Sequence, residues 1–170
     1  MMMAAAAPFA ADDLLQLLPR LTRFARALTR NRADADDLVQ DTVEKALKAA
    51  ARFQPGTRLD SWLFRIARNA WIDEARSRRV RAAVASDADP AEAPAAEGED
   101  AMQARLALGA VGRAMEELPD EQREVAALIL VDGASYREAA EILGVPQGTV
   151  TSRLARARAA LMQAAYGDAA

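Results

Sequence analysis

The middle of the chain holds a stretch of alanine, proline and acidic residues that constrains the possible folds more than any other feature. Over residues 82–100 the apolar residues follow no regular period, while aspartate and glutamate recur throughout. Such a segment cannot bury enough apolar surface to offset the entropy lost on ordering it, so we expect a flexible acidic linker. The rest of the sequence then forms two small domains, over 10–81 and 101–165, each with a modest core of its own.

Both halves carry the apolar periodicity of amphipathic helices, with leucine, valine, isoleucine and alanine recurring at spacings of three and four. Strong helix formers are abundant and aromatic residues are few, which favours an all-α protein. Turn signals and cap residues such as Asp60, the expected N-cap of the third helix, set the boundaries. The pattern predicts helices over 14–28, 34–50, 60–79, 102–118, 119–133, 135–144 and 147–162.

The chain contains no histidine and no cysteine. These are the commonest general base, the commonest metal ligands and the usual thiol nucleophile, so most catalytic and metal-binding constellations are excluded. The aspartates and glutamates lie at spacings typical of exposed helix faces. We therefore expect a protein that is not an enzyme, with no cofactor and no metal site.

No apolar run approaches the length of a membrane span. The short apolar start lacks basic residues and is soon interrupted by Asp12 and Asp13, so we interpret it as a frayed end rather than a signal peptide. We expect a cytoplasmic protein with no membrane insertion.

The net charge is −3, yet the signs are segregated along the chain. Arginines cluster over 76–81 and again over 153–158, and the acidic segment lies between the two clusters. Because phosphate contacts need only a local basic surface, the negative total does not exclude a nucleic-acid partner.

The segment from Ser135 to Leu161 has the form of a helix-turn-helix, in which a short helix and a longer one are joined by a turn at Gly144. Ser135 and Glu138 have the spacing of a capping box. An apolar stripe on the second helix leaves a polar, acid-free face suited to contacts with bases and phosphates. The alternative is an ordinary helical hairpin with a solvated arginine face. The candidate DNA-binding residues on that face are Thr149, Thr151, Ser152, Arg153 and Arg156.

This half resembles the C-terminal promoter-binding domain of extracytoplasmic-function (ECF) sigma factors of the sigma-70 family. The residues that carry the resemblance are LP at 118–119, YREAAEILGV at 136–145 and GTVTSRLARAR at 148–158. The first half is independently similar to the N-terminal domain of the same family. Its DADDLVQDT at 34–42 is similar to the polymerase-binding helix, and its SWLFRIARN at 61–69, followed by Asp73 and Arg76, to the promoter-melting helix.

The resemblance implies a sigma factor that binds RNA polymerase core and directs promoter recognition, DNA melting and transcription initiation of a stress or envelope-response regulon. Sigma region 2 would occupy 10–81 and recognise the minus-ten element, and sigma region 4 would occupy 101–165 and recognise the minus-thirty-five element. The implied partners are the largest-subunit coiled coil and the flap of polymerase, promoter DNA and an anti-sigma factor. The residues implied to contact polymerase, which the sequence alone would leave as a solvated helix face, are Asp37, Gln40, Asp41 and Glu44.

Melted promoter DNA needs a basic track for its phosphates and a pocket or stacking face for an extruded base. Phe53, in the loop over 53–59, and Asn69 are candidates for the pocket. Trp62 is expected in the core, and Trp71 is left open between core and stacking surface. The candidate phosphate track comprises Arg58, Arg65, Arg68, Arg76, Arg78 and Arg79.

Two other functions remain as alternatives. An ordinary helix-turn-helix transcription regulator would have similar final helices, but it would bind its promoter without polymerase. A sigma-like decoy would bind an anti-sigma factor and never touch DNA, and it would be expected to have lost the arginine clusters that this chain retains.

Overall fold

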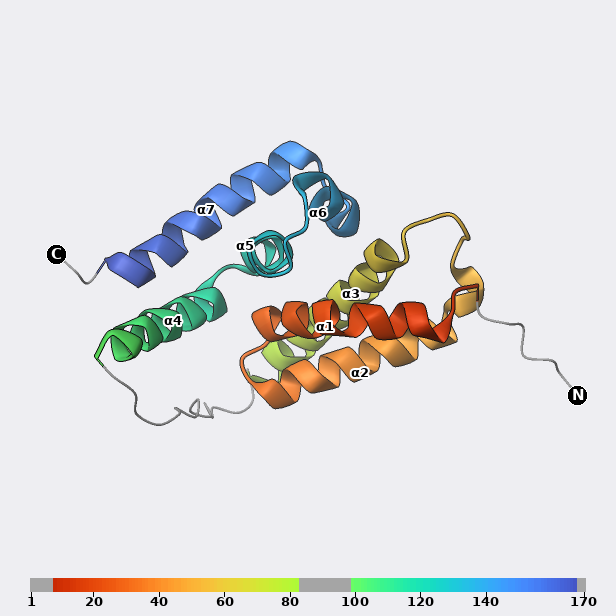
Figure 1. Cartoon of the computed structure of the whole chain (residues 1–170), viewed down its shortest axis with the longest axis horizontal. Coiled ribbons are helices and arrows are strands. Elements are labelled where there is room, and N and C mark those ends of the chain that lie inside the picture. The colour runs from red at the N-terminus through yellow and green to blue at the C-terminus, as the bar shows by residue number, and fades with distance from the viewer. Residues whose placement is uncertain (1–7, 83–98, 168–170) are drawn as a thin grey trace, which may run out of the picture.

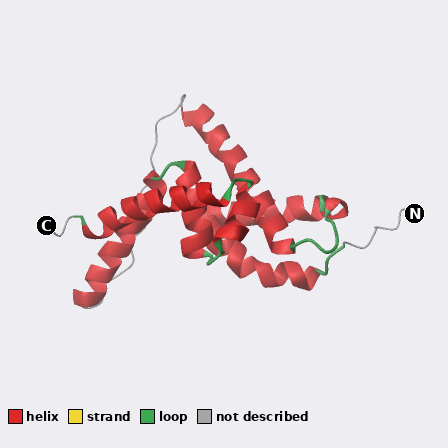
Figure 2. Cartoon of the chain, turned by 90° about the horizontal axis from the view of Figure 1, so that it is seen from above, coloured by secondary structure: helices red, strands yellow, loops and turns green. Residues whose placement is uncertain are grey.

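The computed structural model describes residues 8–82 and 99–167, apart from the side chains of 79, 81–82, 99–105 and 107. Helices are the only regular elements in the described ranges, which confirms the predicted all-α fold (Figures 1 and 2). The expected linker over 82–100 falls almost wholly outside the described residues, since α3 ends at Ala82 and α4 begins at Glu99. Within the described part of the chain, no helix has the length and apolar character needed to cross a membrane.

The first half is a bundle of three helices, α1 (Ala11–Leu28), α2 (Arg32–Lys48) and α3 (Leu59–Ala82), with a short 3₁₀ turn, η1 (Ala50–Arg52), between the last two. The Asn31 side chain caps α2 by accepting a hydrogen bond from the backbone N–H of Asp34 at 2.8 Å. Helix α3 begins one residue earlier than expected, so Asp60 is a first-turn residue and not the N-cap. Its carboxylate is instead bound by two arginines.

The second half contains α4 (Glu99–Glu117), α5 (Asp120–Ala126), α6 (Tyr136–Leu143) and α7 (Gln147–Tyr166). Helix α5 continues directly into one π-helical turn, η2 (Ala127–Val131), which the apolar periodicity did not predict. Helix α7 packs against α4, α5 and α6. Val111 and Met115 of α4 cover a small cluster around Leu161, whereas Leu106 and Leu108 of the expected apolar side of α4 are exposed.

The two halves are packed against each other, mainly through α1 against η2 and α3 against α6. One cluster of buried residues runs across this contact. It joins Phe24 and Phe64 of the first half to Leu128 and Leu154 of the second. We expected each half to have a core of its own. The packing also joins the two halves, because α5, η2 and α6 bury apolar side chains against α1 and α3. The tryptophans Trp62 and Trp71 both pack into this cluster.

Candidate functional site

Helix α7 is positioned by a helix-turn-helix, as the sequence predicted. Both bonds of the capping box form: the Ser135 backbone N–H donates to Glu138 at 2.8 Å, and the Glu138 N–H donates to the Ser135 hydroxyl at 3.2 Å. Gly144 ends α6 with φ of +65°, a left-handed conformation that glycine adopts without steric cost. Val150 and Leu154 lie on the inner face of α7 and are buried, so the opposite face of this helix points outward.

The outward face of α7 carries the predicted upstream DNA-binding residues. Thr151, Ser152 and Arg156 are exposed, and Thr149 is half-buried. The hydroxyls of Thr151 and Ser152 donate to backbone carbonyls within α7, both at 3.1 Å, and can exchange these bonds for acceptors on DNA. Arg153 is the exception, since its side chain is 17% exposed and forms an ion pair with Glu121 of α5 at 3.0 Å.

Three arginines of the predicted downstream surface point toward the second half. Arg58, just before α3, pairs with Glu138 of α6. Arg65 donates to the backbone carbonyl of Glu141 at 2.9 Å, and Arg68 lies 3.1 Å from the carboxylate of Glu124 in α5. These side chains extend from one face of α3 and its N-terminal approach, and that face lies against α6, with Arg68 reaching Glu124 of α5.

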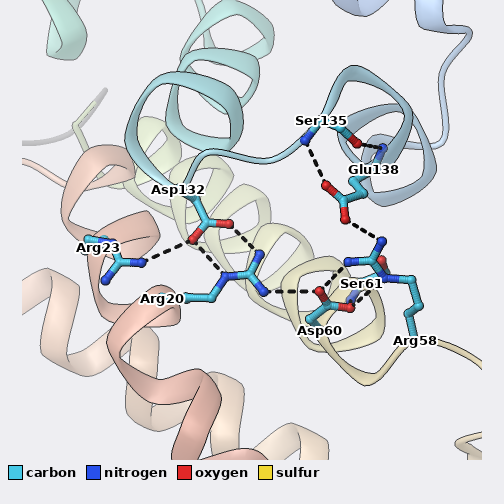
Figure 3. Close-up of polar contacts among 8 residues, drawn as sticks. All are labelled: Arg20, Arg23, Arg58, Asp60, Ser61, Asp132, Ser135 and Glu138. Carbon is cyan, nitrogen blue, oxygen red and sulfur yellow. Dashed lines mark hydrogen bonds and ion pairs between the residues drawn. The ribbon is translucent and has the colours of Figure 1, made fainter.

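A carboxylate and guanidinium network joins α1, the start of α3 and the segment before α6 (Figure 3). Asp132 follows η2, and its side chain is 1% exposed. It accepts two hydrogen bonds from Arg20, at 2.8 and 3.2 Å, and lies 3.7 Å from Arg23. Arg20 also donates to Asp60 at 3.1 Å. Hydrogen bonds from Arg58, assisted by the Ser61 N–H and Arg20, lower the pKa of Asp60 to about 2.

Glu124 is a buried acid in the same interface, with only 2% of its surface exposed. Burial raises its pKa, and the nearby Arg68 guanidinium acts against that increase. The adjacent Arg123 reaches the first half as well: its guanidinium lies 5.8 Å from the centre of the Trp71 ring and 3.5 Å from the carbonyl of Leu28. Trp71 is thus a buried residue that carries an arginine on its ring, rather than an exposed stacking surface.

The rest of the predicted downstream set is divided between core and surface. Phe53 is 7% exposed and packs edge-on against Phe9 and Trp62, with ring centres 5.5 and 5.2 Å apart. Phe53 thus supports the loop over 53–59 by packing its ring into the core at the start of that loop. Asn69 and Arg76 are exposed.

Arg78 forms ion pairs with Asp34 of α2 at 2.9 Å and with Glu74 of α3 at 3.1 Å. It therefore joins α3 to the start of α2. The side chain of Arg79 lies outside the described residues.

The four residues expected to contact polymerase lie together on the polar side of α2. Asp37, Gln40 and Glu44 are exposed, and Asp41 is half-buried and paired with Lys45 at 2.7 Å. Asp37 and Asp41 also line a shallow hollow between α2 and α3. This acidic face belongs to a helix that packs mainly against α1 and α3, so it remains accessible while the two halves are in contact.

Several of the acids and arginines that join the two halves are absent from the predicted site. Arg20, Arg23, Glu124 and Asp132 were not singled out as site residues. The sequence does carry a partial signal that Glu124 is buried. Glu124 lies in the helix that follows the Pro119 cap, and its neighbours Val125 and Ala126 are apolar residues of the core. For the others, only the packing of distant segments reveals the role.

Comparison with known proteins gives the same assignment for both halves. The family model described as Sigma-70 region 2 matches residues 9–81, and that described as Sigma-70, region 4 matches residues 108–161. The ECF RNA polymerase sigma factor EcfG of Rhodopseudomonas palustris is 40% identical over 94% of this chain and 86% of its own length. SigM of Mycobacterium tuberculosis, another ECF sigma factor, is 39% identical over 90% of this chain and 76% of its own.

A solved structure is similar throughout the fold as well. The sigma factor RpoE of Bartonella quintana, in complex with the anti-sigma factor NepR, has a TM-score of 0.75 and 36% identity, covering 90% of this chain and 94% of that one. The helical arrangement, the exposed α7 face and two family matches in chain order agree with one another. The chain belongs to the sigma-70 family of RNA polymerase sigma factors, in its extracytoplasmic-function group.

Proposed function

We propose that this sigma factor uses three separate surfaces to bind RNA polymerase core and to direct promoter recognition, strand opening and initiation. A region 2 domain over 10–81 carries the polymerase face and the downstream DNA surface. A region 4 domain over 101–165 carries the upstream surface, and the linker over 82–100 connects them. The observation that carries this proposal is that both family matches occur in one chain, in the order 9–81 and 108–161.

The acidic side of α2 is the proposed polymerase contact. It presents several carboxylates and an amide on one exposed helix face, which suits a basic or polar partner surface such as a coiled coil of the largest subunits. The flap of polymerase is the proposed contact of region 4. The residues proposed for the α2 contact are Asp37, Gln40, Asp41 and Glu44.

The downstream surface is proposed to hold the melted minus-ten element. Arginines along α3 would neutralise phosphates, while Asn69 and the loop over 53–59, which Phe53 supports, would accommodate an extruded base. The phosphate-binding residues proposed here are Arg58, Arg65, Arg68, Arg76, Arg78 and Arg79.

The upstream surface on α7 is proposed to read the minus-thirty-five element in the major groove. Arginine there can pair with guanine or phosphate, and hydroxyls can bond to either. The proposed residues are Thr149, Thr151, Ser152, Arg153 and Arg156. RNA synthesis itself belongs to polymerase, so the chain acts by placing the enzyme and opening the strands, and it acts in the cytoplasm.

An anti-sigma factor is the proposed regulator. RpoE of Bartonella quintana was solved with the anti-sigma factor NepR, and a second similar structure is CnrH with the cytosolic domain of CnrY, at 32% identity and a TM-score of 0.66. The likeness to two sigma factors held by such partners supports a comparable partner for this chain.

Run-off transcription with sigma-free core polymerase tests the function. The template is a set of genomic fragments that includes the promoter of the protein's own gene. We expect transcripts that require the protein and that disappear with Arg153→Ala plus Arg156→Ala. The matched control, Arg26→Ala plus Arg113→Ala, removes two exposed positive charges that lie outside the proposed DNA and polymerase surfaces and should leave transcription intact.

The alternatives predict different results. Promoter binding by the protein alone, unchanged by core polymerase, would favour an independent helix-turn-helix regulator. Binding to an anti-sigma factor without any effect on initiation would favour a decoy, although both arginine clusters argue against it.

A further inference from the structure

A groove between the two halves is lined on one side by three arginines from the end of α1 and the turn that follows it. The groove has a volume of about 380 Å³, and its other side is formed by α4 and the last residue of η2. Ligand sites in proteins commonly have volumes of about 300–1,000 Å³. Because both halves line the groove, it exists only while they are in contact. The residues that matter for its chemistry are Arg23, Arg26 and Arg30 from the first half and Met115, Glu116 and Val131 from the second.

The protein neutralises the positive charge of this groove poorly. In the part of the chain that the structure describes, Arg26 and Arg30 form no ion pair with a carboxylate, and Arg23 lies 3.7 Å from Asp132. Asp132 already accepts two hydrogen bonds from Arg20. The three arginines of the groove are exposed, and their like charges repel one another. An anion bound between them would therefore relieve this repulsion and accept their hydrogen bonds.

The dipole of α1 explains only part of this arrangement. A cation in the last turn of a helix is stabilised by the partial negative charge of the C-terminal carbonyls, which accounts for Arg26. Arg23 lies before the last turn, and Arg30 lies beyond Leu28, where α1 ends. A second hollow shares Arg26 and Arg30 with the groove and extends to Arg32 at the start of α2. The positive surface is therefore larger than the helix end requires, and it suits a ligand with several negative charges.

The opposite side of the groove is mainly apolar. Met115 is half-buried and Val131 is exposed, and Gly112 leaves open space there, since a Cβ atom at this position would meet no neighbouring side chain within 4 Å. Glu116 is the one acid among the described residues that line the groove. Its carboxylate repels phosphate from this side and can accept a hydrogen bond from the amino group of a base. The groove thus has one side for phosphates and another for a flat, largely apolar ring.

We propose that this groove binds a nucleoside polyphosphate, whose phosphates are held by Arg23, Arg26 and Arg30 and whose base packs against Met115 and Val131. Arginine suits this role because its paired N–H donors match phosphate oxygens. A nucleic-acid strand fits less well, because a concave site of this size holds a single nucleotide, whereas a strand needs an extended basic track. The proposal goes beyond the sigma function, since none of these residues belongs to the proposed DNA or polymerase surfaces.

Isothermal titration calorimetry of the full chain tests the site, with ATP, GTP and inorganic tripolyphosphate as probes. Arg26→Ala plus Arg30→Ala should bind both nucleotides at least about tenfold more weakly than the wild type, because two donors of charge-assisted hydrogen bonds are lost. The matched control, Arg52→Ala plus Arg113→Ala, removes two exposed positive charges outside the groove and should bind as the wild type does. Absence of nucleotide binding by the wild type, or an equal loss in the two doubles, would overturn the proposal.

Gly112→Leu tests the position of the ligand without changing any charge. Leucine forms helices better than glycine does, so α4 is retained while the new side chain fills space in the groove. We expect nucleotide binding to weaken at least about tenfold. The control Gly109→Leu makes the same change at an exposed glycine of α4 that is not among the residues lining the groove. If the arginine double lost binding but Gly112→Leu did not, the arginines would form an open phosphate-binding surface, as for nucleic acid, and the nucleotide site would be excluded.

Tripolyphosphate shows whether the base contributes to binding. It offers phosphates without a nucleoside, so we expect it to bind at least about tenfold more weakly than ATP or GTP, because no ring is buried against the apolar side. Equal affinities would overturn the assignment to a nucleotide. Bound nucleotide should also raise the midpoint of thermal unfolding, since it contacts both halves of the folded chain, and an unchanged midpoint at saturation would contradict the site. Failure of the run-off assay with intact nucleotide binding would count against the sigma function alone.

Discussion

The carboxylate of Asp132 receives two hydrogen bonds from the guanidinium of Arg20, although 112 positions separate the two residues in sequence. Arg20 also binds Asp60 at 3.1 Å, so a single side chain of α1 connects the start of α3 with the segment that leads into α6. This relationship couples the two halves of the molecule. Altering the pair should therefore weaken the contact between the two halves as well as the stability of the fold.

Replacing Arg20 with alanine should destabilise the protein. Arg20→Ala leaves the buried Asp132 with the more distant Arg23, and we expect the free energy of unfolding to fall by about 1–3 kcal/mol, less than for a fully buried pair because Arg20 is one-third exposed. Urea unfolding followed by circular dichroism measures the change. The control Arg32→Ala breaks an exposed pair with Asp36. If Arg32→Ala lowered the free energy of unfolding as much as Arg20→Ala does, the role assigned to Arg20 would be contradicted.

Removing Arg68 should make stability depend on the protonation of Glu124. Burial raises the pKa of Glu124, with Arg68 and Arg153 acting against it and Asp120 adding to it. In Arg68→Ala the pKa rises further. An acid with a raised pKa in the folded state binds its proton more tightly when folded, so stability is gained below the folded pKa and lost as the pH rises through it.

The destabilisation caused by Arg68→Ala should accordingly be smaller at pH about 5 than at pH about 7, the lower value being closer to the ordinary pKa of glutamate. Urea unfolding of the wild type and the variant at both pH values measures it. Adding Glu124→Gln to Arg68→Ala should abolish this dependence. A pH-independent loss, or one that grows as the pH falls, would show that Glu124 does not titrate as argued.

Gly144 should resist substitution more than a glycine within a helix. Its φ of +65° is a left-handed conformation, which costs an alanine about 1 kcal/mol. Gly112 lies inside α4 with open space around the position of a Cβ atom, so Gly112→Ala should stabilise the protein by up to about 1 kcal/mol. Thermal unfolding of both variants measures the two changes in stability, which should have opposite signs. A change of the same sign in both would be inconsistent with a left-handed turn that requires glycine at position 144.

The helices and the helix-turn-helix could be predicted because their signals are local. Apolar spacing, the Ser135 and Glu138 box and Gly144 each act within a few residues, and the structure contains all of them. The π-helical turn after Ala126 has no such local signal. The burial of Phe53 depends on Phe9, which lies before the first predicted helix.

The contact between the two halves could not be predicted from spacing. Arg20 and Glu138 are each typical of a solvated helix face, and only long-range packing makes them interface residues. The arginines near α3 stay predicted DNA contacts, and their present partners, such as Glu124, come from a distant segment. Long-range electrostatic pairs of this kind leave no period or motif in a single sequence.

The acidic face of α2 should be required for binding to core polymerase and dispensable for folding. Asp37→Arg reverses a charge on an exposed side chain, and we expect it to weaken binding to core at least about tenfold because it places like charges against the partner surface. Fluorescence anisotropy of labelled protein titrated with core measures the affinity. Asp12→Arg makes the same charge change at an exposed position of α1 and should bind as the wild type does. Equal binding by the two variants would exclude this face as the polymerase contact.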